Sequence, residues 1–213
     1  LAANAASVGT GNRRVAPRAG GSIGNAASAT SSFTGTAGVT YTLRWSITNA
    51  PCAASTDDVT ITLRANPTTA NAGPDQTVCG TGATLAANTA TIGTGGWSVV
   101  TGAGGSFGNT ASPTSSFTGT AGVTYTLRWS ITNAPCTAST DDVVITLVAA
   151  PTTANAGPDQ TVCGTGATLA ANAASVGTGN WSVVAGAGGS FGNAASATSS
   201  FTGTAGVTYT LRW

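Results

Sequence analysis

The feature that most constrains this chain is an internal repeat with a period of 84 residues. The segment 31–45 recurs without a single change at 115–129 and again at 199–213. Self-similarity at a fixed spacing indicates one structural unit per copy, stacked or strung along the chain. The sequence therefore predicts about two and a half copies of one small fold.

Two proline-containing segments, 65–69 and 149–153, mark the predicted boundaries, because proline after a strand-like run stops sheet pairing. On this phasing the domains are 1–66, a repeat without its first strand, then 67–150, a complete repeat, and 151–213, a repeat without its last strand. Since the pattern is cut at both ends, we expect the sequence to be a window from a longer protein.

The complete copy has the pattern of short β-strands. Apolar and polar residues alternate along 125–132 and again along 143–147, as in strands with one buried face. Shorter strands are expected between Gly-rich and Asn-rich turns at 83–86, 97–100 and 115–118. About seven short strands per repeat and no helical pattern predict an all-β fold, in which each repeat is an immunoglobulin-like β-sandwich.

The composition argues against several classes of function. Charged residues make up 6% of the chain, with a net charge of +1, and they are all Arg or Asp. Without His, Lys or Glu, the chain lacks the usual general bases, so we expect no enzyme activity. No basic face for nucleic acid and no membrane-spanning segment is expected. A weakly charged, hydroxyl-rich surface repels its neighbours little, which predicts self-association into fibres or lateral arrays.

The order of motifs resembles the PKD-like and immunoglobulin-like tandem repeats of large Bacteroidetes cell-surface proteins. The resemblance rests on five segments of the complete copy, namely 70–79, 95–97, 122–129, 135–136 and 141–143. It implies an extracellular array on a bacterial cell, often exported by type IX secretion and associated with adhesion or gliding. It implies no catalytic activity.

Four oxygen-bearing side chains form the candidate metal site. Asp141 and Asp142 are adjacent in a predicted strand, so their side chains should point to opposite faces. One interpretation is that they cap the strand and discourage edge pairing. The other is a calcium site that joins them to Asp75 and Asn71, since calcium prefers oxygen ligands. No other cofactor is expected.

The four cysteines follow the repeat, because Cys52 corresponds to Cys136 and Cys79 to Cys163. Their spacing is not that of zinc or redox motifs, which favours structural disulfides in an oxidising compartment. Three pairings respect the period: Cys79 with Cys136, Cys52 with Cys79, and Cys79 with the Cys136 position of a following copy. The resemblance implies self-contained repeats and hence the Cys79–Cys136 bond, with Cys52 and Cys163 pairing outside the window.

Four further residues, two Trp and two Arg, carry predictions of their own. Trp97 and Trp129 could form a sugar-binding platform, but a Trp in an alternating strand favours the core. Arg128 is expected to pair with an Asp on a neighbouring strand. In the first copy Arg13 stands where the others have Trp, within a divergent stretch 13–18, which predicts that this copy is the weakest.

Together these observations predict a structural repeat array of an extracellular bacterial surface adhesin or filament, acting as a non-catalytic spacer or assembly element. Two alternatives stay open. One is an array of carbohydrate-binding or protein-binding modules, and the other is an accessory region of a larger secreted enzyme.

Overall fold

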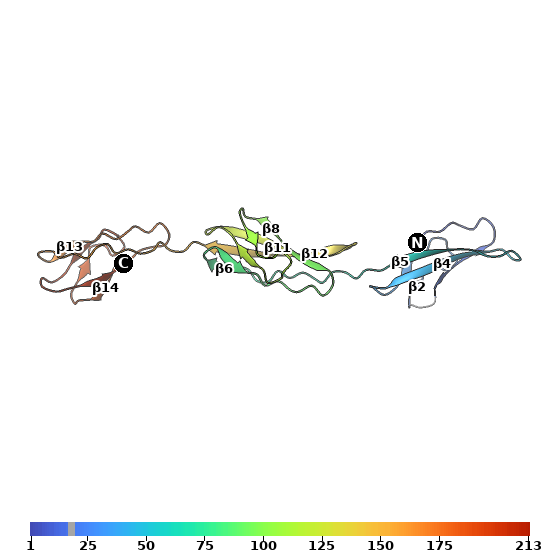
Figure 1. The fold of residues 1–213 in the computed structure, drawn as a ribbon, viewed down its shortest axis with the longest axis horizontal. Helices are drawn as coiled ribbons and strands as arrows, with labels where there is room; N and C mark the ends of the chain where they lie inside the picture. The colour runs from blue at the N-terminus through green and yellow to red at the C-terminus, as the bar shows by residue number, and fades with distance from the viewer. Residues whose placement is uncertain (17–19) are drawn as a thin grey trace.

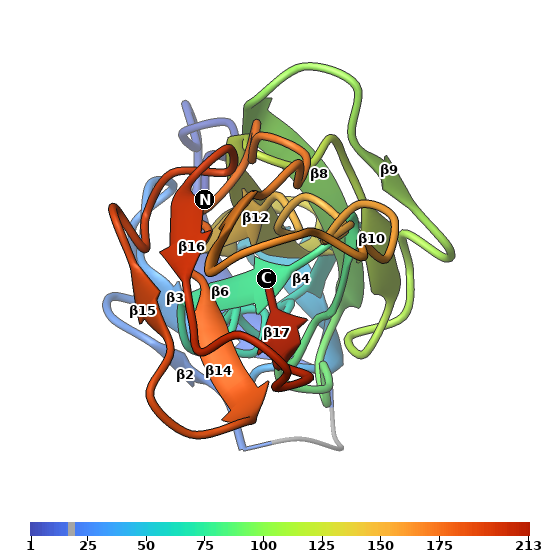
Figure 2. The same ribbon diagram turned by 90° about the vertical axis from the view of Figure 1, so that its left-hand side faces the viewer.

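The computed structural model describes residues 1–16 and 20–213, and in these residues the chain contains β-strands and no helix. Figure 1 shows three units in line along the longest axis, from the N-terminal unit to the C-terminal one. Viewed along that axis in Figure 2, the units lie behind one another. No helix that could cross a membrane occurs in the described part of the chain.

The middle unit, which was expected to be complete, contains seven strands. They are β6 (Gln76–Cys79), β7 (Gly82–Thr84), β8 (Thr94–Thr101), β9 (Ser106–Phe107), β10 (Ser116–Thr118), β11 (Thr124–Asn133) and β12 (Cys136–Val148). One sheet has the order β6-β12-β11-β8 and the other β7-β10-β9. Strand β6 runs parallel to β12, and the other pairs are antiparallel. This two-sheet arrangement confirms the predicted immunoglobulin-like β-sandwich.

The flanking units repeat parts of this plan. The first contains β1 (Thr10–Val15), β2 (Ser22–Ile23), β3 (Phe33–Thr34), β4 (Thr40–Thr48) and β5 (Ser55–Thr62). The third contains β13 (Gly166–Thr168), β14 (Ser182–Ala185), β15 (Ser190–Phe191), β16 (Ser200–Thr202) and β17 (Thr210–Arg212). The β1-β4-β5 sheet corresponds to β8-β11-β12, as the period requires.

The core of the middle unit follows the predicted alternation. On β11, Tyr125, Leu127, Trp129 and Ile131 are almost fully buried, while the intervening side chains face outward. Phe117 of the opposite sheet is also buried and meets Tyr125 edge-on, with 4.9 Å between ring centroids. The period-2 pattern therefore identified the buried face of this strand correctly.

The first segment and the last strand of a repeat bury each other. Ala72 is 1% exposed in the middle unit, whereas its counterpart Ala156 is exposed in the third unit, where the sequence stops before a last strand. Val143 of β12 is 1% exposed, but its counterpart Val59 is 43% exposed in the first unit, which has no first segment. A repeat thus needs both ends to close its core; the predicted domain boundaries themselves stay a prediction.

The two ends of the middle unit lie at opposite ends of β12. At the incoming end, which we define by residues 65–68 and 133–136, the Asn133 side chain donates a hydrogen bond to the Ala65 carbonyl (2.8 Å). At the outgoing end, Cys79 pairs with Val148, the last residue of β12. A strand rises about 3.3 Å per residue, so the thirteen residues of β12 separate these ends by about 40 Å.

Candidate functional site

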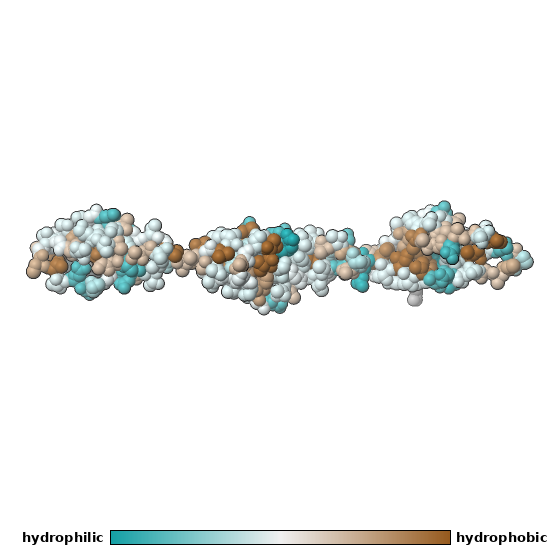
Figure 3. All heavy atoms as spheres, turned by 90° about the horizontal axis from the view of Figure 1, so that it is seen from above, coloured by the Kyte–Doolittle hydropathy of each residue, from teal (hydrophilic) through white to brown (hydrophobic). Residues whose placement is uncertain are grey.

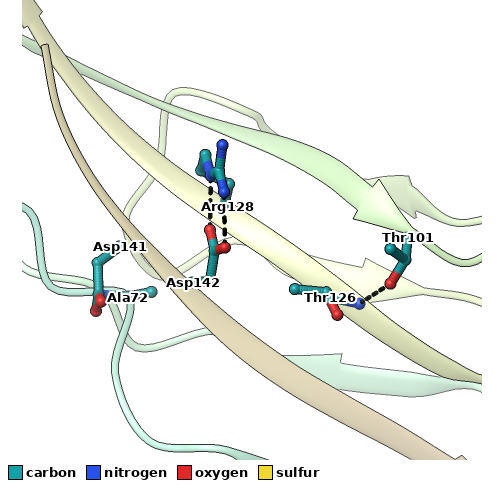
Figure 4. A network of polar contacts seen from close by, with 6 residues as sticks. All are labelled: Ala72, Thr101, Thr126, Arg128, Asp141 and Asp142. Atoms are coloured by element: carbon teal, nitrogen blue, oxygen red, sulfur yellow. Dashed lines mark hydrogen bonds and ion pairs between the residues drawn. The ribbon is translucent and has the colours of Figure 1, made fainter.

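The adjacent carboxylates of β12 point in opposite directions, as expected for neighbours in a strand. Figure 4 shows Asp142 directed toward Arg128 and Asp141 directed away from it, toward Ala72. Arg128 Nε and Nη2 donate to the two carboxylate oxygens of Asp142 at 2.7 and 2.8 Å, across directly opposed positions of β11 and β12. Arg44 and Asp58 form the same pair in the first unit. The prediction of a cross-strand partner for Arg128 is therefore confirmed.

These bidentate ion pairs shift the acidity of the carboxyl groups. Hydrogen bonds from Arg128 lower the pKa of Asp142, and those from Arg44 lower the pKa of Asp58. Both pairs lie on the outer face, with more than a third of each side chain exposed. Water and salt screen such pairs, so their net contribution to stability is small.

The other three side chains of the candidate metal site also have protein partners. Asp141 Oδ2 accepts a hydrogen bond from the Ala72 amide (2.8 Å), and Asp75 Oδ1 accepts one from the Val144 amide (2.8 Å). Asn71 Oδ1 accepts one from the Gly73 amide (2.8 Å). The first two contacts attach the first segment of the repeat to β12, and the third lies within that segment.

Calcium binding at these residues stays a prediction. The described residues contain no group of three or more His, Cys, Asp or Glu side chains arranged to hold a metal ion. Each of the four side chains already satisfies a backbone amide or a guanidinium group. The geometry by itself thus accounts for their positions through hydrogen bonding.

The two tryptophans of the middle unit are core residues. Trp97 is 5% exposed and Trp129 1% exposed, with 5.1 Å between their ring centroids. The Trp97 indole nitrogen donates a hydrogen bond to the Ser112 carbonyl (3.0 Å). Buried faces cannot stack on a sugar, so the core interpretation is confirmed and the platform is excluded in the complete copy.

The third unit has a wide hollow at the position that a strand fills in the middle unit. It has a volume of about 490 Å³, and its lining includes Leu169, Trp181, Phe201 and Leu211. The middle unit fills the corresponding space with β12, whose residues have no counterpart before the sequence stops at Trp213. The hollow in the third unit therefore lies where the middle unit places β12.

Arg13 occupies the interior position that Trp97 and Trp181 occupy in the other copies. It is 3% exposed, its Nη2 donates to the Ala29 carbonyl (2.9 Å), and its guanidinium lies 5.4 Å from the ring centre of Trp45. Its Nε is buried without a hydrogen-bond partner. Of the rest of the divergent stretch, Pro17 and Arg18 lie outside the described residues.

The predicted Cys79–Cys136 bond is wrong in this structure. All four cysteines are free thiols. Cys136 begins β12 at the incoming end, while Cys79 pairs with Val148 at the outgoing end. The length of β12, about 40 Å, separates them, whereas a disulfide requires Cα atoms within about 7 Å. The resemblance to self-contained repeats suggested the bond, and the parallel pairing of β6 with β12 prevents it.

Sequence reasoning missed the polar role of a core tyrosine. The buried Tyr125 hydroxyl accepts a hydrogen bond from the Thr120 amide (2.8 Å) and donates one to the Ala103 carbonyl (3.0 Å). Tyr209 makes the same two bonds in the third unit. The spacing of five residues between Thr and Tyr, repeated in each copy, was the available signal. The tyrosine joins the loop after β8 to the loop before β11.

The outer surface is mostly of intermediate polarity. In Figure 3 the visible face is largely near-white, with separate brown apolar spots and a few teal ones. Threonine pairs cross the strands, including Thr124 with Thr146 and Thr94 with Thr132, both 3.3 Å between hydroxyl oxygens. Several valines are also partly exposed, among them Val100 and Val148 at 44%.

No protein-family model and no curated protein matches this sequence. Among solved structures, the insect immune protein hemolin aligns over 76% of this chain with 12% identity and a TM-score of 0.41. This chain spans about half of hemolin, 48% of its length. A protocadherin gammaB7 EC3-6 cis-dimer structure aligns over 92% of this chain and 60% of its own, with 12% identity and a TM-score of 0.38. Mouse cadherin-23 EC22-24 aligns over 92% and 75%, with 13% identity and a TM-score of 0.37. Such distant likenesses do not bear on what this chain does.

Proposed function

We propose that this chain is part of a non-catalytic extracellular spacer, a linear array of sandwich repeats that projects from a bacterial surface as an adhesin stalk or filament. The observation that carries the proposal is the position of the chain ends in the complete repeat. The chain arrives beside Asn133 and leaves at Val148, at opposite ends of β12. Each added copy therefore extends the array instead of folding back on it.

The near-identity of the copies supports a mechanical role. A recognition array diversifies the loops that contact ligands, but here the segment 31–45 is unchanged in all three copies. The large aromatic side chains Trp97 and Trp129 are buried in the core and do not face a ligand. No specific observation favours the carbohydrate-binding alternative or the accessory region of a secreted enzyme.

Self-association of the arrays is a finer part of the proposal. The chain has a net charge of +1, so long-range repulsion between copies is weak. Identical units repeated along an axis can form lateral or head-to-tail contacts that need not close into a ring. Sedimentation velocity over a range of concentration and salt tests this part, and persistent monomers at all conditions would overturn it.

Small-angle scattering tests the spacer itself. The 213-residue chain is compared with a chain lengthened by one further copy of 67–150. The maximum dimension should increase by about 40 Å, the length of one β12 strand. An unchanged dimension would show that the repeats fold back on one another, and the spacer proposal would then fail.

A further inference from the structure

The cysteine at the incoming end of the middle unit lies against the last strand region of the unit before it. Cys136 Sγ lies 3.3 Å from the Ala65 carbonyl oxygen and 3.8 Å from the Arg64 carbonyl oxygen. Arg64 lies two residues beyond β5 (Ser55–Thr62) of the first unit. Cys136 is thus positioned at the junction between two repeats.

The 84-residue period shows which residues of a complete preceding repeat would lie at this junction. Arg64 is 84 positions before Val148, so the two residues are equivalent. In the middle unit the Val148 carbonyl accepts a hydrogen bond from the Gly80 amide (2.8 Å), and Val148 pairs with Cys79. In a complete preceding repeat, the Arg64 carbonyl would accept the same bond from the residue that follows the Cys79 equivalent.

One carbonyl oxygen therefore has both cysteines as neighbours. The Cys136 sulfur lies 3.8 Å from it in the following repeat, and in a complete preceding repeat the Cys79 equivalent would pair with Arg64 as Cys79 pairs with Val148. Cys79 is exposed, on the outward phase of β6, while Val78 faces the core side. A disulfide needs its two Cα atoms within about 7 Å. Of the three periodic pairings, only this one brings both cysteines to the same junction, because Cys136 lies at the incoming end of its repeat and Cys79 at the outgoing end.

We propose that a disulfide joins the Cys79 position of each repeat to the Cys136 position of the next, so that every junction of the array is covalently bridged. The bond forms by exchange with a disulfide oxidant, either a small molecule or an oxidoreductase. The two thiols lose two protons and two electrons, and the oxidant's disulfide is reduced to two thiols.

On this pairing Cys136 and Cys79 have no partner among the 213 residues. The partner of Cys136 belongs at the Cys79 position of the first repeat, five positions before residue 0 (79 − 84 = −5), and the partner of Cys79 at position 220 (136 + 84). Neither position is within the 213 residues. The inference deepens the proposed spacer function and rests on its in-line arrangement, because a bridge at each junction would limit bending and separation of neighbouring repeats.

The experiment supplies the missing partner to the whole chain. A copy of residues 67–84 is placed directly before Leu1, which is equivalent to Leu85, so that the first repeat gains its first strand and its cysteine. After oxidation with a glutathione redox pair, non-reducing peptide mapping should find the added cysteine bonded to Cys136. Cys52, Cys79 and Cys163 should remain free to react with an alkylating reagent. The mass of the chain should fall by about 2 Da for the one bond formed, because two thiol hydrogens are lost.

Two matched variants identify the bond. Cys136→Ser should abolish it, and Cys52→Ser should leave its yield unchanged. A bond from the added cysteine to Cys52, a bond between Cys52 and Cys79, or four free thiols alongside a free added cysteine would each overturn the proposal. Scattering on the same samples measures the in-line array separately: an extended but unbridged chain rejects the disulfide alone, and a folded-back chain rejects the spacer.

Discussion

The indole ring of Trp129 lies over the α-carbon of Gly95 on the neighbouring strand. A β-carbon added to Gly95 would overlap ring atoms of Trp129, and the same contact joins Gly179 with Trp213 and Gly11 with Trp45. This relationship explains why a glycine precedes the Trp97 position by two residues in every copy. Because the glycine has no β-carbon, the tryptophan ring of the neighbouring strand in the sheet can occupy this space.

We predict that Gly95→Ala destabilises the middle repeat, because the methyl group and the ring cannot share this space. Overpacking of this kind costs about 1–3 kcal/mol of unfolding free energy. Gly96→Ala is the matched control, since nothing lies within 4 Å of a β-carbon there. Denaturant unfolding followed by tryptophan fluorescence measures both, and equal stability of the two variants would contradict the contact.

Trp97→Ala should be more damaging still. The side chain is 5% exposed and packs against Trp129, so its removal leaves a cavity and should cost about 3–5 kcal/mol. Val100→Ala on the same strand is the control, because Val100 is 44% exposed. Unfolding curves of wild-type stability for the Trp97 variant would place that residue at the surface.

Arg13→Trp should stabilise the first repeat. The change restores the residue of the other two copies and removes a buried Nε that has no hydrogen-bond partner. An unsatisfied buried polar group costs about 1–3 kcal/mol. Arg14→Ser, which matches the exposed Ser98, should have little effect. The first thermal transition in calorimetry reports the gain, and a lower transition temperature would mean that the guanidinium supports this copy.

Two variants of Asp141 test whether its carboxylate serves as a hydrogen-bond acceptor for the backbone or as a metal ligand. Asp141→Ala should leave the Ala72 amide unsatisfied and cost about 1–3 kcal/mol, while Asp141→Asn keeps an acceptor oxygen and should cost less. Unfolding is measured with calcium and with a chelator. An acceptor role predicts the same values in both, whereas stabilisation by calcium that is lost in the Asn variant would assign a calcium site.

Stability should fall modestly below about pH 4. The folded-state pKa of Asp142 and Asp58 is lowered, so each ion pair stabilises the fold above the unfolded carboxyl pKa of about 3.9. That contribution is lost as the pH falls through the lower, folded-state value. Asp142→Asn should flatten this part of the pH profile, and Asp159→Asn, which has no ion pair among the described residues, should not. Identical profiles for both variants would be the contrary result.

The local features of the fold were predictable from the residues alone. Alternation along 125–132 identified the buried face of β11, and the aromatic residues on that face form the core as expected. A cross-strand Asp partner for Arg128 was also anticipated, and the structure identifies it as Asp142 on the adjacent strand. Such properties depend on the two-residue period of a strand, which the sequence displays directly.

The sequence by itself determined the period, the strands and which side chains are buried, because these depend on neighbours close in the chain. Only the tertiary structure decided where the ends of a repeat lie. Strand β6 pairs parallel with residues of β12 that lie 69 positions later (145 − 76 = 69), and this pairing puts Cys79 at the outgoing end and Cys136 at the incoming one. No local pattern encodes that choice, since it arises from mutual burial of Ala72 and Val143 when the first segment covers the last strand.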